Sequence, residues 1–417
     1  MMIASSRKSA LLRFSFILLA TLFALPYPAA FARKANKLSK TAIRALAPAL
    51  PEASLAHWHE AEKRLENAIS SGGWPKVPEK AKLKLEPGAD DPIITAIRTY
   101  LQSVGDLPAP KKSRKKLKTA PLNSVYDEAL AAAVIRFQTR HGLEPDGIIG
   151  NGTVKAMNVS PQVRLNQLRI NQERIENLPS DSGKSLLVNI PQFTLYGLSG
   201  SHHPDFTMRV IVGERRADHR TPLLDAEMSY VVINPQWHVP QSIMTKEMLP
   251  KLKNDATYLS RQNMKVMQTV DGQAVSVDPT TVDWSKVDST TFNYRFAQDS
   301  GAGNALGRIK FIFPNRHNVY LHDTTTKSLF ARGVRDFSHG CVRVHKPLDL
   351  AEYVLADNAG WSKEAVETAI KRGAQKVVFL KEKLPVHLTY VTAWVDANGN
   401  SYFLDDIYGY DRRARKK

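Results

Sequence analysis

The only cysteine in this 417-residue chain, Cys341, has neighbours that could make its thiol a nucleophile. It directly follows Ser338-His339-Gly340, and His322 stands seventeen positions before His339 at the end of an apolar run. A sole cysteine with nearby histidines is the pattern of a nucleophile and its general base. We therefore predict covalent, nucleophilic chemistry at Cys341.

The residue types around the cysteine suit that chemistry. A free thiol, with a pKa of about 8.5, needs cationic or dipolar neighbours to ionise at neutral pH. His322, His339 and Arg343 could supply them, and strand alternation would place Tyr320 on the same face as His322. Gly340 permits a tight turn in which backbone N–H groups converge, and such donors are the parts of an oxyanion hole.

Three other interpretations compete with a cysteine nucleophile. A lone cysteine can be a buried hydrophobe, although the flanking His-Gly and Arg343 argue against this here. A serine nucleophile at Ser338 would need a G-x-S-x-G elbow, which is absent. A metal site has five possible ligands close in sequence: His317, His322, His339, Cys341 and His345. Their spacing is not that of a known zinc motif, so we expect neither a metal nor a cofactor.

The stretch from His322 to Ser338-His339-Gly340-Cys341-Val342-Arg343 resembles the signature of YkuD-type L,D-transpeptidases. The resemblance implies catalysis on peptidoglycan stem peptides through a thioester on Cys341. It assigns His322 as the base, oriented by the peptide at Asp323. It places His339 and the N–H groups of Gly340 and Cys341 on the oxyanion side.

The same resemblance suggests which residues meet the substrate. Arg343 would bind a substrate carboxylate or give electrostatic support, because a guanidinium suits bidentate carboxylate contacts. A structural salt bridge is an equally good interpretation of this arginine. Ser338, Tyr320 and Trp237 complete the expected substrate-binding set; Trp237 lies in a segment that looks like large YcbB-like members of the family.

The N-terminus has the features of a secretory signal. Three cations, Arg7, Lys8 and Arg13, precede the short apolar run Phe14–Leu25, and Ala30-Phe31-Ala32 offers a small-x-small cleavage site. We read residues 1–32 as a signal peptide and expect a periplasmic, envelope-associated protein; an uncleaved anchor is the alternative. No later stretch has the ~18 apolar residues of a membrane span.

Composition limits the possible partners. The formal net charge is +18, and removing the signal's three cations would lower it to +15. Such a surplus favours anionic polymers or membrane surfaces. The export signal and the lack of a recognised nucleic-acid motif argue against nucleic acid. Apolar residues make up 43% of the chain, enough for several cores.

In the first half of the chain, apolar residues recur with the three-to-four spacing of a helix face. Trp58, Ala61, Leu65 and Ile69 predict a helix within a scaffold segment, residues 33–90. Residues 91–160 predict a three-helix module, and the stretch 137–153 is similar to the repeat of peptidoglycan-binding domains. Residues 161–183 predict a helical connector.

From residue 184 the pattern changes to that of strands. We therefore expect a multidomain α+β protein whose catalytic domain, residues 184–411, is mainly β and sandwich-like. Its last strands are predicted at Val377–Leu380, Val386–Val395 and Tyr402–Leu404. Residues 244–303 interrupt the strands and, by resemblance, cap the catalytic cleft; residues 412–417 form a basic tail expected to be disordered.

Three functions fit these features. The first is an L,D-transpeptidase that joins stem peptides and reacts with carbapenem-type β-lactams. The second is an L,D-carboxypeptidase that hydrolyses the same thioester. The third is a peptidoglycan-binding scaffold with an inactive catalytic domain, which the intact His322 and Cys341 pair disfavours.

Overall fold

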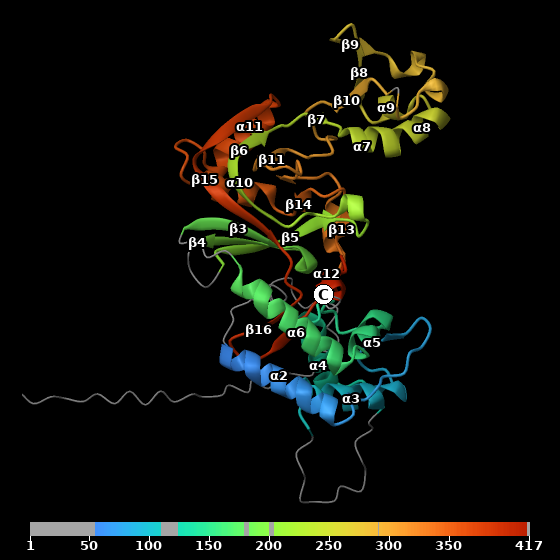
Figure 1. Ribbon diagram of the computed structural model, residues 1–417, viewed down its shortest axis with the longest axis vertical. Helices are drawn as coiled ribbons and strands as arrows, with labels where there is room; N and C mark the ends of the chain where they lie inside the picture. The colour runs from blue at the N-terminus through green and yellow to red at the C-terminus, as the bar shows by residue number, and fades with distance from the viewer. Residues whose placement is uncertain (1–54, 110–123, 179–182, 200–203, 291, 415–417) are drawn as a thin grey trace, which may run out of the picture.

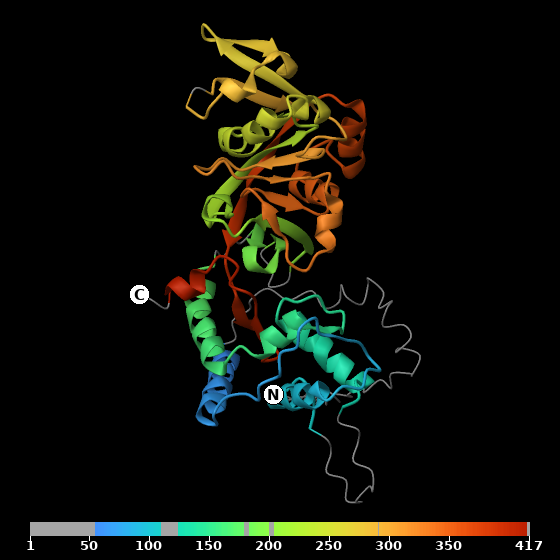
Figure 2. The same ribbon diagram turned by 90° about the vertical axis from the view of Figure 1, so that its right-hand side faces the viewer.

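The computed structural model describes residues 55–109, 124–178, 183–199, 204–290 and 292–414. The expected signal, residues 1–32, and the start of the scaffold segment lie outside these ranges. Figures 1 and 2 show helices at one end of the molecule, a β-rich domain in the middle and a smaller lobe at the other end. Among the described helices, none has the length and apolarity that crossing a membrane requires.

A small helical domain follows the first helix. Its elements are β1 (Lys84–Leu85), α3 (Ile93–Ser103), α4 (Glu128–Arg140), β2 (Ile149–Gly150) and α5 (Asn151–Met157). The side chain of Asp127 caps α4 by accepting the N–H of Leu130 at 2.9 Å. Gln138, buried on α4, accepts the Gly147 N–H at 2.9 Å and donates to the Asp146 carboxylate at 3.0 Å. The predicted glycine-containing turn is therefore fastened to the domain core.

The helix α2 (Leu55–Ser70) packs against the connector helix α6 (Pro161–Glu176) and against the end of the chain. The apolar period of the scaffold segment is confirmed by the burial of Trp58, Ala61 and Leu65. The predicted strand Val386–Val395 is divided, and its first part lies in β15 (Lys376–Thr389) of the central sheet. Its second part forms β16 (Ala393–Val395), and the predicted strand Tyr402–Leu404 forms β17 (Ser401–Phe403). They do not close the catalytic sheet, however, but pair with each other and pack on α2 and α6.

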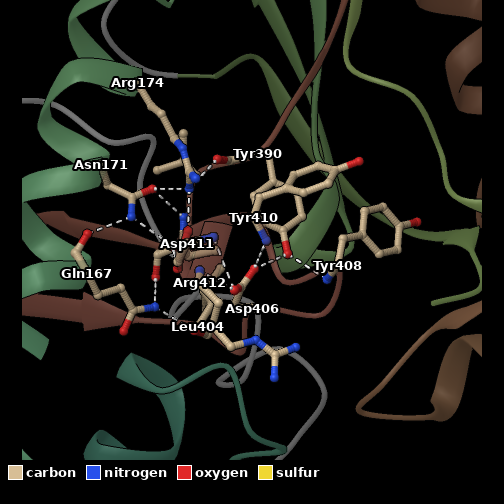
Figure 3. A network of polar contacts seen from close by, with 12 residues as sticks. Gln167, Asn171, Arg174, Tyr390, Leu404, Asp406, Tyr408, Tyr410, Asp411 and Arg412 are labelled. Atoms are coloured by element: carbon tan, nitrogen blue, oxygen red, sulfur yellow. Dashed lines mark hydrogen bonds and ion pairs between the residues drawn. The ribbon is translucent and has the colours of Figure 1, made fainter. Parts of the chain in front are cut away.

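A polar network fastens this C-terminal segment to α6 (Figure 3). Arg174 binds the Asp411 carboxylate at 2.6 Å, and Gln167 donates to the Leu404 carbonyl at 2.8 Å. Asp406 accepts the hydroxyl proton of Tyr390 at 2.8 Å. The last helix, α12 (Tyr410–Ala414), includes the start of the basic tail that we expected to be disordered. Those residues are ordered because the acidic side chains before them are bonded to α6 and Tyr390.

The central domain is built on a nine-stranded mixed sheet in the described part of the chain. The strand order is β13-β5-β14-β12-β11-β6-β15-β3-β4, and β4 also pairs with β5. The strands are β3 (Lys184–Asn189), β4 (Thr194–Ser199), β5 (Phe206–Gly213), β6 (Leu224–Ile233), β11 (Ile309–Ile312), β12 (Leu321–His322), β13 (Asp336–Ser338), β14 (Val342–Val344) and β15 (Lys376–Thr389). The β4–β5 pairing closes the sheet around one apolar core, which helices α10 (Pro347–Leu355) and α11 (Lys363–Arg372) complete.

The distal lobe is an insertion with its own core and sheet (yellow in Figure 1). Its sheet has the order β7-β10-β8-β9, from β7 (Trp237–His238), β8 (Met264–Val270), β9 (Gln273–Val277) and β10 (Tyr294–Gln298). The insertion therefore begins at Trp237 rather than at Met244, because β7 pairs with β10. Its helical side contains α7 (Gln241–Ile243), the π-helical turn η5 (Met244–Met248), α8 (Leu249–Asn254) and α9 (Tyr258–Arg261).

Candidate active site

Pairing of three short strands brings the predicted motif together. β12 pairs with β14 in parallel and with β11 in antiparallel register, so that His322 lies opposite both Arg343 and Lys310. Because side chains alternate along strands, Tyr320, His322 and Lys310 share one sheet face with Cys341 and Arg343. Pairing continues to the cysteine, since the N–H after it donates to the Tyr320 carbonyl at 3.1 Å. The sheet thus gathers a thiol, an imidazole and two cations on one face.

His322 is buried and held in the tautomer that a general base needs. Its Nδ1 lies 2.5 Å from the backbone carbonyl oxygen of Asp323. A carbonyl can only accept, so Nδ1 carries the proton and Nε2 keeps its lone pair. Burial, with a smaller contribution from the charges of Arg343 and Lys310, lowers the pKa of His322 to about 3. His322 is therefore a neutral imidazole at neutral pH.

The Asp323 peptide that orients His322 is itself fixed. The Asp323 carboxylate accepts the N–H groups of Arg308 at 2.8 Å and Thr324 at 2.7 Å, and it pairs with Lys327. Gly307 packs against this carboxylate with φ +63°; a Cβ at that position would lie 2.3 Å from the aspartate side chain. Only glycine allows this close approach.

The thiol of Cys341 is half-buried, and its surroundings keep it protonated. Burial raises the pKa of Cys341, and this outweighs the opposing effects of the Tyr320 N–H, Lys310 and Arg343. Sγ lies 4.0 Å from the Asn318 carbonyl oxygen. This corrects the expectation that nearby cations leave a resting thiolate.

No hydrogen bond joins the Cys341 thiol and the His322 imidazole within the described residues. The Tyr320 ring instead lies edge-on to the His322 ring, with 5.6 Å between centroids. Catalytic hydrogen bonds are often long or unformed without substrate. The arrangement is therefore a neutral thiol beside a neutral base, which must meet when the substrate carbonyl is bound.

The turn before the cysteine leaves one backbone donor free. Gly340, with φ +116°, donates its N–H to the Ser338 hydroxyl at 3.2 Å, and that hydroxyl donates to the Cys341 carbonyl at 2.5 Å. Ser338 thus braces the turn from inside, and its hydroxyl is not free for a substrate. The Gly340 N–H is likewise already engaged. In the described ranges the Cys341 N–H has no partner, so the expected pair of oxyanion donors reduces to this one.

Two further residues, Thr221 and Tyr408, hold the same turn in place through hydrogen bonds. Thr221 donates its hydroxyl proton to the Gly340 carbonyl at 2.8 Å and accepts the Gly213 N–H at 2.8 Å. The Tyr408 hydroxyl in turn accepts the Thr221 N–H at 3.1 Å and donates to the Gly213 carbonyl at 2.6 Å. The C-terminal segment therefore reaches the turn that precedes Cys341 through Tyr408, which Figure 3 places beside Tyr390.

Two cations at the site have no acidic partner among the residues that the structure describes. The Arg343 guanidinium bonds the Thr326 hydroxyl at 3.3 Å, and the Lys310 ammonium lies 3.9 Å from the Tyr320 ring centroid. Neither makes an ion pair within the described chain, and burial lowers the pKa of both. The salt-bridge interpretation of Arg343 thus has no partner there. Sequence reasoning missed Lys310, although a lone cation in an otherwise apolar strand was a usable signal.

His339 and Trp237 lie on the side of the insertion. The exposed His339 ring places Nε2 2.5 Å from the Glu247 carboxylate, which belongs to the π-helical turn. Trp237, expected to bind substrate, packs against the apolar core of the insertion at its base. Glu247 was not predicted, because nothing in the sequence indicates that its turn meets the catalytic loop.

Comparison with known proteins matches two domain families. Residues 183–378 match the YkuD family, described as "L,D-transpeptidase catalytic domain". Residues 90–157 match a family described as "Putative peptidoglycan binding domain". A Haemophilus influenzae protein named "Putative L,D-transpeptidase" is 38% identical over 250 residues, 59% of this chain and 48% of the relative. The chain thus spans about half the length of that curated relative.

Solved structures with some likeness include two L,D-transpeptidases. An L,D-transpeptidase from Stackebrandtia nassauensis is 13% identical with a TM-score of 0.26, covering 75% of this chain and 96% of that one. L,D-transpeptidase 3 from Mycobacterium tuberculosis, in complex with a faropenem-derived adduct, is 14% identical with a TM-score of 0.21 and covers 50% and 60%. Scores this low add nothing to the assignment, which rests on the family matches.

The matched ranges coincide with the two units that the fold separates. The YkuD range begins at β3 and contains the His322 and Cys341 strands, and the peptidoglycan-binding range contains α3, α4 and α5. Residues 183–378 therefore belong to the YkuD family of L,D-transpeptidase catalytic domains, which this chain joins to a peptidoglycan-binding domain.

Proposed function

We propose that this protein is a peptidoglycan L,D-transpeptidase that works through a thioester on Cys341. The observation that carries the proposal is the shared sheet face of Cys341 and His322, with the imidazole fixed as a neutral base. The family assignment of the domain sets the reaction class. The donor would be a tetrapeptide stem with diaminopimelate, or a similar residue, at its third position.

In the first step, Cys341 attacks the carbonyl at the L-centre of that third residue. Because the thiol rests protonated, His322 Nε2 takes the proton as the C–S bond forms. The Cys341 N–H, the donor left free by the turn, stabilises the oxyanion, with His339 beside it. The proton then passes to the leaving amine, and the terminal D-alanine departs as the thioester forms.

In the second step, an amine of another stem's third residue attacks the thioester. His322 takes the amine proton and returns it to sulfur, so the cysteine is regenerated and a cross-link remains. Water in place of the amine would give an L,D-carboxypeptidase. The insertion favours transfer, because a lobe that contacts the catalytic loop through Glu247 helps to exclude water from the thioester.

The unpaired cations suit a substrate that carries carboxylates. We assign Arg343 and Lys310 to the free carboxylates of the donor stem, since each lacks an acidic partner in the described chain. The peptidoglycan-binding domain would hold glycan strands near the site, and the surplus of positive charge favours this anionic polymer. We place the protein in the periplasm on the basis of its N-terminal sequence and its substrate.

One experiment separates the three candidate functions. Purified protein is incubated with a disaccharide-tetrapeptide, and the products are identified by mass spectrometry. Cross-linked dimer identifies the transpeptidase, tripeptide with free D-alanine identifies the carboxypeptidase, and unchanged substrate identifies a scaffold. The Cys341→Ala protein is the control, and product formation by that folded variant would end the thioester proposal.

The same nucleophile should react with carbapenem-type β-lactams. Their strained ring presents a carbonyl to the thiol and to the same oxyanion donor. Intact-protein mass spectrometry should show one added drug mass on the wild type and none on Cys341→Ala. An adduct on the alanine variant would place the reactive group elsewhere.

A further inference from the structure

Three potential metal ligands meet where the insertion contacts the catalytic loop. They are His219 from the turn after β5, Glu247 from the π-helical turn and His339 from the motif. One ligand atom of each lies within 4.8 Å of the other two. The first two residues come from elements far in sequence from the Cys341 motif.

The distances are close to those around a small tetrahedral cation. The Glu247 carboxylate oxygen lies 2.5 Å from His339 Nε2, in a hydrogen bond whose proton a metal ion would replace, and 3.9 Å from His219 Nε2. Zinc bonds of about 2.0–2.2 Å in a tetrahedron put neighbouring ligand atoms roughly 3.3 Å apart. Side-chain movements on the order of an ångström would therefore admit the ion.

His219 is already prepared as a ligand by an outer carboxylate. Its Nδ1 lies 3.2 Å from the Glu214 carboxylate, which can only accept, so Nδ1 carries the proton and Nε2 offers its lone pair. A carboxylate behind a histidine is the arrangement that orients metal-bound imidazoles in proteins. His219 is also buried, which keeps its ring in place.

The local backbone and charge also favour a ligand here. Glu247 lies in a π-helical turn, a rare conformation that is frequent at functional sites. Two neutral imidazoles with Glu247 and the outer Glu214 would balance a divalent cation. The nearby cations Lys246 and Arg216 both pair with the Asp218 carboxylate at 3.3 Å, and this carboxylate also lies 4.0 Å from His219 Nε2.

We propose that His219, Glu247 and His339 form a binding site for a divalent transition-metal ion of the zinc type, with the fourth position open. The ion would fasten the insertion to the catalytic loop through Glu247. It would also withdraw His339 from the oxyanion side. Metal binding itself is independent of the proposed activity, whereas its effect on Cys341 acylation rests on that activity.

The test is a titration that does not use catalysis. Full-length Cys341→Ala protein, which lacks the competing thiol and carries no histidine tag, is titrated with Co²⁺ and followed by its visible absorption. Zn²⁺ affinity is then measured by calorimetry. We expect one ion per chain with the intense absorption of tetrahedral Co²⁺. Glu247→Gln should weaken Zn²⁺ binding by tenfold or more, on the order of the loss typical of an altered metal site.

Two further variants sharpen the result. Glu214→Gln, which changes only the outer carboxylate, should weaken binding about tenfold to hundredfold. His317→Asn, at an exposed histidine outside the cluster, should leave the affinity unchanged. Absence of stoichiometric binding, an octahedral Co²⁺ spectrum, or equal affinity in Glu247→Gln would each overturn the proposal. His219→Asn is a weaker choice, because loss of a buried ring can disturb folding.

A second arm joins the site to the active centre. In the wild type, Zn²⁺ should slow acylation of Cys341 by a carbapenem, and Glu247→Gln should remove most of that inhibition. Equal inhibition of wild type and Glu247→Gln would show that the ion acts at the thiol, against the proposed consequence. If the wild type is not acylated at all, the proposed function fails while the titration still decides the metal site.

Discussion

The Thr221 hydroxyl lies 2.8 Å from the carbonyl oxygen of Gly340. A trans peptide is planar, so its C=O and N–H point to opposite sides. By holding the Gly340 carbonyl, Thr221 therefore also fixes the direction of the Cys341 N–H, the donor that the turn leaves free. The proposed oxyanion donor is thus positioned by a residue more than a hundred positions away in the sequence, which is itself held by Tyr408.

The first prediction tests this positioning with Thr221→Val. The variant loses the bond to Gly340 and leaves the buried Gly213 N–H unsatisfied, at a cost of about 1–3 kcal/mol in the free energy of unfolding. Acylation of Cys341 by a carbapenem, which needs the oxyanion donor, should slow by roughly tenfold to hundredfold. Alkylation by iodoacetamide forms no oxyanion and should be nearly unchanged.

Thr221→Ser is the matched control, because it keeps the hydroxyl and should restore acylation. Both rates are measured by intact-protein mass spectrometry, and stability by urea unfolding. Equal slowing of acylation and alkylation in Thr221→Val would show a general disturbance of the site instead of a misplaced oxyanion donor.

The second prediction concerns the pH dependence of acylation. His322 has a pKa of about 3 in the folded protein, so it is already neutral at pH 5, and the Cys341 thiol stays protonated because its pKa is raised. Between pH 5 and 8 both reactants keep one protonation state, and the wild-type acylation rate should be nearly flat. A bell-shaped pH profile of the acylation rate, with its acidic limb near pH 6.5, would contradict a neutral Cys341 thiol beside a neutral His322 imidazole.

The variant His322→Gln gives the same argument a second readout. Without the base, only the small thiolate fraction can react, so acylation should rise about tenfold per pH unit and fall well below the wild-type rate at pH 6.

His322 also makes stability depend on pH. Since its folded pKa lies below the ordinary value of 6.5, the neutral ring stabilises the fold above pH 6.5, and that contribution is lost as pH falls toward 3.

The third prediction tests the support of the Asp323 peptide through Gly307→Ala. The new Cβ would lie 2.3 Å from the Asp323 side chain on a left-handed backbone, so the aspartate must move. We expect a loss of about 1–3 kcal/mol in the free energy of unfolding from overpacking. Acylation should also slow, because the carbonyl that orients His322 shifts.

Gly303→Ala is the control for that substitution. A Cβ there meets no atom within 4 Å, and the variant should match the wild type in stability and in acylation rate. Thermal unfolding and the carbapenem reaction decide the outcome. Wild-type acylation in Gly307→Ala would mean that the Asp323 carbonyl is not needed to orient the base.

The sequence predicted the parts of the site that lie close together in the chain. His322, Asp323 and Cys341 belong to one motif, and two adjacent short strands bring His322 and Cys341 onto one sheet face. Thr221, Glu247 and Lys310 come from other segments, and only the paired sheet and the folded insertion bring them there. The sequence also could not show in which direction the pKa of the Cys341 thiol shifts, because the direction depends on whether burial outweighs the nearby cations.

The fold shows the same division between local and distant information. Alternating apolar residues predicted strands at Val386–Val395 and Tyr402–Leu404, and the structure has strands at Ala393–Val395 and Ser401–Phe403. Alternation does not say which strand is the partner, so we placed them in the catalytic sheet, whereas they pair with each other and cover α2 and α6. Their position depends on the bonds that Gln167 and Arg174 make to the C-terminal segment.

The last prediction concerns substrate recognition by Arg343. Its guanidinium has no acidic partner in the described chain and bonds only a threonine hydroxyl there, so Arg343→Gln should not break a stabilising ion pair. We expect the free energy of unfolding to change little.

If the arginine binds a carboxylate of the donor stem, loss of that charged hydrogen bond costs about 1.5–3 kcal/mol, and KM for the tetrapeptide should rise roughly tenfold to hundredfold. Arg332→Gln, at an exposed arginine between β12 and β13, should leave KM unchanged. A donor stem amidated at its carboxylates should bind wild type and Arg343→Gln equally, because the charge that the guanidinium recognises has been removed. Two results would contradict this role: a wild type that prefers the amidated donor, or an Arg343→Gln protein that retains the wild-type KM while it loses stability. Arg343 would then serve the fold, and the substrate carboxylate would be held elsewhere. Lys310 is the other cation at the site without an acidic partner in the described chain.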